Sequence, residues 1–287
     1  MLISKLLKSS TRHFFTKSAY NFSIVRINDK QTLKFPYKFS GYDVAIQNKL
    51  SESYQEVLDD VFQTDTRAGF KYAYANTIEA FLQKDFEYFR DICEPGLYSE
   101  VERGLLNLDE LDLELESTEL YEDKVKVAID SFSLIYGVQH IREENFSAKN
   151  YTSKEYSMNG VDLKLYTAKA YDPMYVKKLQ PMIQIGCLFY SNQDILLRKK
   201  GGEVVAGEDS NGYHRLVFEL TSESDEPEGS KYLDKVLNSP TAMLGALGIL
   251  VSNQKMIEFI RNLFGVNEAV WKIVDIDNHL NGNPHIG

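Results

Sequence analysis

Two aspartates near the end of the chain have a spacing that loosely resembles a calcium-binding loop. Asp275 and Asp277 are followed by Asn278, and Gly282 comes shortly after. A calcium loop of the EF-hand type needs a glycine at its sixth position and a glutamate at its twelfth. Gly282 stands at the wrong position and no glutamate follows where one is needed. We therefore interpret the segment as a polar turn at the end of a strand and expect no metal site.

A basic run followed by two glycines, Arg198-Lys199-Lys200-Gly201-Gly202, could form a phosphate-binding turn. It lacks the longer loop and the Ser or Thr of a P-loop. The pattern is typical of a charged hairpin tip. Arg198, Lys199 and Lys200 remain candidate contacts with anionic lipid, because a basic residue near such a surface contributes about 1 kcal/mol.

The chain has only two cysteines, Cys93 and Cys187, which lie far apart in the sequence. This count excludes a disulfide framework and a four-cysteine zinc site. No motif in the sequence indicates a cofactor, so none is expected.

The first 28 residues contain no acidic residue, although the whole chain has 42. Basic and hydroxyl residues alternate there with apolar ones. An acid-free, basic, amphipathic start of this kind is typical of a mitochondrial transit peptide. We expect residues 1–40 to form a basic targeting or docking arm and residues 41–287 to form one domain. The candidate contacts in the arm are Lys5, Lys8, Arg12 and Lys17.

Charge is segregated along the chain. Residues 1–40 carry a net charge of +7, which leaves −17 for the remainder because the chain totals −10. A strongly acidic body makes nucleic acid an unlikely partner. The hydrophobic content of 43% is that of a globular protein. No apolar run reaches the roughly 18 residues that a membrane-spanning helix needs.

Apolar spacing predicts helices in the first half of the chain and strands in the second. The helical segments are 48–62, 66–92 with a break at Lys84-Asp85 that starts a short second helix at Phe86, and 97–108. The strand segments are 125–136, 161–171, 182–199, 213–220 and 270–276. Helices followed by consecutive strands indicate an α+β fold, with about three helices on one face of a curved antiparallel sheet.

A helical insert is expected at about residues 230–265, before the last strand. It carries apolar residues at helical spacing, which favour either a core position or a partner face. The candidate contacts there are Leu244, Leu247, Met256 and Ile260.

Residues 66–110 place a helix, a short break with an acidic and an aromatic residue, and then an L-Y-x-x-V helix in succession. The matching residues are Phe81-Leu82, Asp85-Phe86, Leu97-Tyr98 and Val101. The closing segment from Trp271 to Asp277 is aromatic-rich and strand-like. Together these patterns resemble the Tim-forty-four-like domain family, over roughly residues 60–220 and 268–280.

The resemblance implies a cone-shaped fold like that of nuclear transport factor two, and attachment to the matrix side of the mitochondrial inner membrane. Family members include the import-motor adaptor and a protein of the large mitochondrial ribosomal subunit. This chain lacks a long charged helical region before the domain, and its body is acidic where the ribosomal relative is expected to be basic. Neither specific role therefore transfers directly.

The cone fold also hosts isomerases and hydratases that place an Asp/His or Tyr/Asp pair at the open end of the cone. The residues that could supply such a pair are Tyr72, Asp85, Asp130, His140 and His214. No two of them have a spacing that predicts contact. The structural alternative is that Asp85 caps a helix, Asp130 faces solvent, and both histidines lie at the surface or at strand ends.

Residues 108–123 alternate leucine with eight acidic residues. This pattern predicts a solvated strand edge or an extended segment that docks a basic partner.

We expect a non-enzymatic accessory or adaptor subunit on the matrix side of an inner-membrane complex. The respiratory chain or ATP synthase is the first expected host, followed by the mitochondrial ribosome and the import motor. Its partners would be subunits of that complex, with peripheral contact to anionic lipid. The alternatives from other classes are a small isomerase or lyase, and a lipid-binding module that uses the cone as a pocket.

Overall fold

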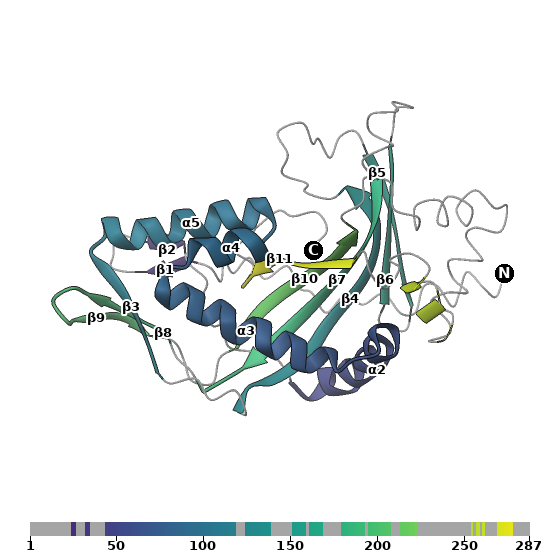
Figure 1. Ribbon diagram of the computed structural model, residues 1–287, viewed down its shortest axis with the longest axis horizontal. Helices are drawn as coiled ribbons and strands as arrows, with labels where there is room; N and C mark the ends of the chain where they lie inside the picture. The colour runs from purple at the N-terminus through teal and green to yellow at the C-terminus, as the bar shows by residue number, and fades with distance from the viewer. Residues whose placement is uncertain are drawn as a thin grey trace.

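The structure is a computed structural model, and its figures show helices on one side of a long sheet (Figure 1). The described residues are 24–26, 32–34, 44–118, 124–138, 151–158, 161–168, 179–192, 195–207, 213–222, 254, 257–258, 260–261 and 269–277. Several predicted contacts lie outside them: Lys5, Lys8, Arg12, Lys17, Leu244, Leu247 and Met256, together with His140.

The fold combines α-helices with a mainly antiparallel sheet, so the predicted α+β class is confirmed. The described helices are α2 (Val44–Phe62), α3 (Thr66–Gln83), α4 (Phe86–Ile92) and α5 (Pro95–Glu110). Each predicted helical segment corresponds to one of them, with ends that differ by a few residues.

Short polar side chains set the helix ends in this region. Asp65 caps α3 by accepting a hydrogen bond from the amide of Ala68, and Lys84 ends it in the left-handed conformation with φ of 53°. Asp85 then caps α4 and Glu94 caps α5 in the same way. A side chain that satisfies a free amide at a helix start is worth about 1 kcal/mol. The predicted break at Lys84-Asp85 is therefore a pair of caps.

The strands form three sheets. They are β1 (Ile24–Arg26), β2 (Thr32–Lys34), β3 (Leu113–Ser117), β4 (Lys126–Val138), β5 (Tyr151–Met158), β6 (Val161–Ala168), β7 (Leu179–Tyr190), β8 (Ile195–Lys199), β9 (Val204–Gly207), β10 (His214–Ser222) and β11 (Ala269–Ile276). The main sheet has the order β11-β10-β7-β4-β6-β5, and only the β4–β6 pair in it is parallel. A second sheet has the order β3-β8-β9, and β1 pairs with β2.

The prediction of one strand over residues 182–199 was wrong. The chain leaves the main sheet after Tyr190, and Ile195 begins β8 in the second sheet. The four polar residues between the two strands, Ser191-Asn192-Gln193-Asp194, are a turn signal that could have shown the break. The sequence reasoning also missed β5, which pairs with β6 so that Met158 lies opposite Val161. The intervening Asn159-Gly160 is a strong hairpin signal that could have found it.

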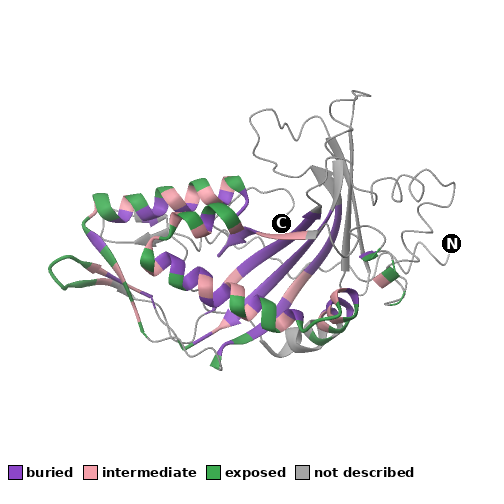
Figure 2. Cartoon of the chain, in the orientation of Figure 1, coloured by how far each residue is buried: buried purple, intermediate pink, exposed green. Residues whose placement is uncertain are grey.

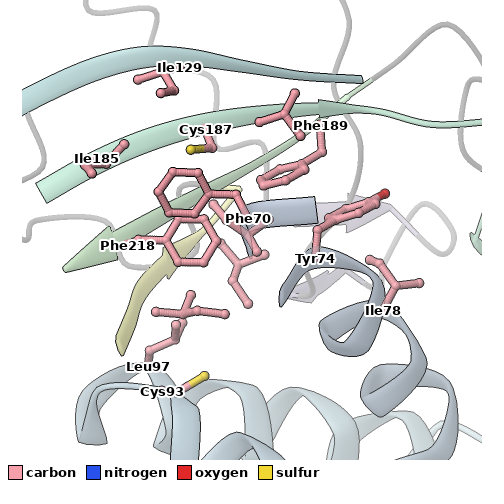
Figure 3. Close-up of a cluster of buried hydrophobic side chains, with 14 of the residues drawn as sticks. Phe70, Tyr74, Ile78, Cys93, Leu97, Ile129, Ile185, Cys187, Phe189 and Phe218 are labelled. Carbon is pink, nitrogen blue, oxygen red and sulfur yellow. The ribbon is translucent and has the colours of Figure 1, made fainter. Parts of the chain in front are cut away.

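The main core lies between α3 and the helix-side face of the six-stranded sheet. Phe70 and Tyr74 of α3 pack against Phe218 and Phe189 of the sheet, with ring centroids 4.7 and 4.6 Å apart. Figure 3 shows these rings filling the space between helix and strands, with Cys187 among them. The central strands are correspondingly buried in Figure 2.

The edge strand β11 is held by the link between α4 and α5. The amide of Glu94 donates to the carbonyl of Ile273 over 2.9 Å, and the ammonium of Lys272 donates to the carbonyl of Asp91. The last strand therefore closes the fold against helices that lie far earlier in the sequence.

Ile260 does not present its side chain to a partner. It is fully buried and belongs to the main core, and Arg261 donates to the carbonyl of Asp60 at the end of α2. The described part of the predicted insert is helical, and this residue serves the core. Apolar residues at helical spacing suit either role, so the sequence left both open.

Candidate functional site

The three-stranded sheet joins two segments that the sequence analysis treated separately. β3 comes from the acidic run and pairs antiparallel with β8, which carries the start of the basic run. The Cα partners include Glu114 with Arg198 and Leu113 with Lys199. In Figure 1 this sheet projects at the opposite end of the molecule from β5. Within the acidic run, Leu113–Ser117 forms an edge strand as predicted, and it lies directly beside the predicted basic hairpin. The start of the run, up to Glu110, belongs to α5 instead.

Arg198 is held on both sides. Its guanidinium forms an ion pair with the carboxylate of Glu116 on β3 and donates to the carbonyl of Gly202 over 3.1 Å. The same side chain therefore links β3 to β8 and ties the hairpin tip back onto its own strand.

Both lysines at the tip also pair with carboxylates. The ammonium of Lys199 lies 2.6 Å from Glu203, and that of Lys200 lies 3.2 Å from Asp112. The amide of Lys200 donates in addition to the carbonyl of Asp112. We call Arg198, Lys199 and Lys200 the basic triplet, and Asp112, Glu116 and Glu203 the paired carboxylates.

The backbone of the tip leaves room for an approaching surface. Gly202 has φ of +89°, which favours glycine, and the amide of Gly202 closes the turn onto the carbonyl of Lys199. A Cβ added at Gly201 or Gly202 would meet no atom within 4 Å. Both glycines are exposed, as Figure 2 shows for the whole tip.

A further pair extends this charged region onto the helices. The ammonium of Lys84 donates to Asp109 at the end of α5. This hydrogen bond holds the pKa of Asp109 below its usual value. All of these pairs are solvent-exposed, and such pairs contribute about 0–1 kcal/mol each. The region is thus a set of exchangeable ion pairs.

The predicted acid–base residues do not come together. Tyr72 is 68% exposed on α3, and Asp85 caps α4 through the amide of Tyr88, as the structural alternative expected. His140 lies outside the described residues. His214 and Asp130 are both buried, but each pairs with a residue that the sequence analysis did not propose for it.

His214 pairs with Asp277 at the ends of β10 and β11. Nδ1 of His214 lies 2.7 Å from Oδ2 of Asp277, and the amide of Arg215 donates to the other carboxylate oxygen over 2.7 Å. The ring of Tyr74 lies 5.9 Å from the imidazole, and its hydroxyl is hydrogen-bonded to Ser191. His214 begins β10, so the expected strand-end position is confirmed, and only 2% of the residue is exposed there.

The prediction that Asp130 faces solvent was wrong. It is the extra residue of a β-bulge, because Ile129 pairs with Cys187 and Ser131 with Gly186. Arg215 donates from Nε to its carboxylate over 2.8 Å and from the terminal nitrogen to Ser131 over 3.2 Å. Alternation from Val127 and Ile129 in the core places Asp130 on the face away from the helices, but Arg215 of β10 reaches across Gly186 and covers the carboxylate there.

The remaining candidate groups have structural roles. Burial raises the pKa of both thiols, Cys93 and Cys187, so they are poor nucleophiles. Within the described residues no group of His, Cys, Asp or Glu is arranged to hold a metal ion. Asp277 lies in a turn directly after β11, as the interpretation of this segment as a strand-end turn expected.

The strand register was the missing signal for the His214–Asp277 pair. His214 begins β10 and Asp277 follows β11, and adjacent antiparallel strands bring a start and an end together. No spacing along the sequence shows this, because the two residues lie 63 positions apart.

No protein-family model matches this chain, and no curated protein matches its sequence. Among the described helices, none is both long and apolar enough to cross a membrane.

Proposed function

We propose that this protein is a non-enzymatic accessory or adaptor subunit, docked on the matrix side of a complex of the mitochondrial inner membrane. Its domain would be of the Tim-forty-four-like, cone-shaped kind. A respiratory-chain complex or ATP synthase is the first host to test, and the mitochondrial ribosome and the import motor follow. The protein would act through surface contacts with other subunits and not through a catalytic site.

The observation that carries this proposal is the packing of the core. Between α3 and the six-stranded sheet, the rings of Phe70, Tyr74, Phe189 and Phe218 are packed against one another (Figure 3). Tyr74 and Phe189 stack with only 5° between their planes. Rings packed in this way supply stability and leave a ligand little room beside them.

The charged surface and the basic arm support the same proposal. The projecting sheet presents carboxylates and bases at an exposed edge, and charged surfaces of this kind steer and orient protein association. The acid-free start of the chain supports delivery to mitochondria. The N-terminal segment would target the protein to mitochondria, and the projecting sheet would form the contact surface.

Native purification of the tagged chain from mitochondria tests the proposal. Blue-native migration with a large complex, and mass spectrometry that finds the subunits of one assembly, would support it and name the host. Migration of the chain alone, near its own mass of 32.9 kDa, would overturn it.

The role of the arm is tested separately. Residues 1–40 are replaced by a foreign targeting signal, so that import no longer depends on them. Reduced assembly of the imported chain would support a docking role, and unchanged assembly would reduce the arm to a targeting signal.

A second candidate function rests on the His214–Asp277 pair. A carboxylate hydrogen-bonded to Nδ1 fixes the orientation of the imidazole, as carboxylates do for the histidine of acid–base sites. If the protein is an isomerase, a lyase or a lipid-binding module, we expect it to bind a small molecule. Native mass spectrometry of the purified chain tests this: a stoichiometric ligand that is lost in His214→Gln supports it, and a ligand-free chain counts against it.

A further inference from the structure

The predicted basic arm, residues 1–40, includes two strands of the folded protein. Ile24–Arg26 forms β1 and Thr32–Lys34 forms β2, and the strands pair antiparallel with Val25 opposite Leu33. Leu33 is only 2% exposed and belongs to the main hydrophobic core. Figure 1 shows β2 beside α5, which it contacts. This part of the arm is therefore packed onto the domain.

The features that indicate a targeting segment lie before β1. Residues 1–23 contain four Lys or Arg residues and no acidic residue, and they include the apolar residues at helical spacing near the start of the chain. The first acidic residue of the chain, Asp29, lies between β1 and β2. The acid-free, amphipathic sequence thus ends close to where the paired strands begin. Two independent observations, one from composition and one from packing, divide the arm at nearly the same place.

We propose that a peptidase which recognises basic, amphipathic segments cleaves the chain at a peptide bond between Met1 and Ile24, and that β1 and β2 stay in the mature protein as part of its fold. In this step, water is added across one peptide bond. The released segment gains a carboxyl group, and the mature chain gains a new amino terminus.

The buried leucine sets the limit for this cleavage. A cut after Leu33 would take its side chain out of the main core and leave a cavity, and the loss of a buried leucine side chain is among the more destabilising single changes. A cut between Ile24 and Leu33 would break the chain within β1 or between β1 and β2, so that β2 loses the strand it pairs with. A cut before Ile24 removes neither contact, so the mature chain keeps its core.

This inference deepens the proposed function and rests on it for the mitochondrial setting. The two can fail separately. An imported chain that is cut after Ile24 would contradict the inference and leave the proposed location intact, whereas a chain that is not imported would contradict the location. The stability of purified protein does not depend on import. The assembly test of the arm also gains a sharper form, because exchanging residues 1–23 alone leaves Leu33 in place.

The amino terminus of the mature chain is the first measurement. The tagged chain is purified from mitochondria, and its first residue is determined by mass spectrometry of the amino-terminal peptide and of the intact protein. We expect the mature chain to begin between Ile3 and Ile24. A chain that lacks at most its first residue, or one that begins after Ile24, would overturn the proposal.

A matched pair of leucine variants then separates the two parts of the arm. Leu33→Ala and Leu6→Ala/Leu7→Ala are made in the full-length chain and produced without mitochondria, so that the arm is intact in both. Leu33→Ala should lower the midpoint of thermal unfolding by about 5–15 °C, because it removes a core side chain. The double variant removes more apolar surface but should shift the midpoint by less than about 2 °C. Equal shifts would overturn the division of the arm.

Cleavage should show the opposite dependence. In an import assay with isolated mitochondria, Leu6→Ala/Leu7→Ala should reduce the fraction of chain that is cleaved, since it weakens the apolar side of the segment. Leu33→Ala should be cleaved like the wild type, and cleavage that depends on Leu33 instead would overturn the proposal. If Leu33→Ala does not fold, the milder Leu33→Val replaces it in the stability measurement. It should shift the midpoint in the same direction by a few degrees, and no shift would also count against the retained strands.

Discussion

The projecting sheet and the far face of the six-stranded sheet, which is the face opposite the helices, both carry an arginine–carboxylate pair. In the projecting sheet, Arg198 and Glu116 are 34% and 54% exposed. On the far face, Arg215 and Asp130 are 13% and 1% exposed. The same chemical pair is therefore exchangeable in one place and fixed in the other. An exposed ion pair is screened by water and can exchange partners, whereas a buried ion pair is held in place and contributes to the stability of the fold.

The fixed pair is built into the strands themselves. Residues of β7 alternate between the core and the far face, so that Ile185 and Cys187 point to the helices while Gly186 faces Asp130 and Arg215. The bulge at Asp130 brings its carboxylate over this glycine. The exchangeable pair has no such surroundings, since its neighbours are a turn and solvent.

The largest expected effect comes from breaking the fixed pair. Arg215→Ala leaves the buried carboxylate of Asp130 without its cation, so we expect a loss of about 3–5 kcal/mol in the free energy of unfolding. Urea unfolding of the folded variant measures it. In the double variant Arg215→Ala/Asp130→Ala the loss should be smaller than the sum of the single losses, because the uncompensated charge is gone. Additive losses would mean that Arg215 and Asp130 do not interact.

The glycine beneath the pair gives the next effect. A Cβ at Gly186 would lie 2.1 Å from a carboxylate oxygen of Asp130 and 2.6 Å from a guanidinium nitrogen of Arg215. Gly186→Ala should therefore destabilise the fold by about 1–3 kcal/mol, measured by thermal or urea unfolding. Gly201→Ala, where a Cβ meets nothing, is the matched control and should change stability by less than about 0.5 kcal/mol. Equal losses of stability in Gly186→Ala and Gly201→Ala would contradict the close packing at Gly186.

The carboxylate of Asp59 is partly buried, so its burial is intermediate between that of Glu116 and that of Asp130. Asp59 of α2 accepts hydrogen bonds from Gln55 and from both the amide and the hydroxyl of Thr66 at the start of α3. Burial acts to raise the pKa of Asp59, but these hydrogen bonds outweigh it and lower the pKa below the ordinary value of 3.8. Its contribution to stability is thus present above that value and is lost as the pH falls through the lowered pKa.

Asp59→Asn should therefore cost about 1–2 kcal/mol at about pH 7, because the amide replaces a charged acceptor. Below the lowered pKa the wild-type carboxylate is protonated too, so the difference between the two chains should shrink as the pH falls towards about 3. Urea unfolding of both chains over this range tests the sign. A difference that grows towards low pH would contradict it.

The sequence predicted the parts of this fold that depend on local signals. Asp85 caps a helix, as the structural alternative for this residue expected, and the α+β order follows from the periodicities. The middle of the acidic run, Leu113–Ser117, was correctly predicted as a strand edge. These features need only neighbours along the chain.

The parts that failed depend on register between distant strands. The burial of Asp130 beside Arg215 and the meeting of His214 with Asp277 both depend on which residues of separate strands lie close together. Local hydropathy does not encode these neighbours, so the residues looked solvent-facing or unrelated.

The smallest expected effect is in the projecting sheet. Glu116→Gln removes the partner of Arg198, which keeps its hydrogen bond to the carbonyl of Gly202. Because the pair is exposed and screened, the free energy of unfolding should change by at most about 1 kcal/mol. Added salt should reduce even this difference, while the loss in Arg215→Ala should persist, since screening acts weakly on buried pairs.

Urea unfolding at low and high salt measures both variants side by side. A loss in Glu116→Gln as large as that in Arg215→Ala would mean that the projecting sheet is a rigid part of the fold. A small, salt-sensitive loss is what an exchangeable surface requires, because ion pairs that are to open for a partner must contribute little to folding.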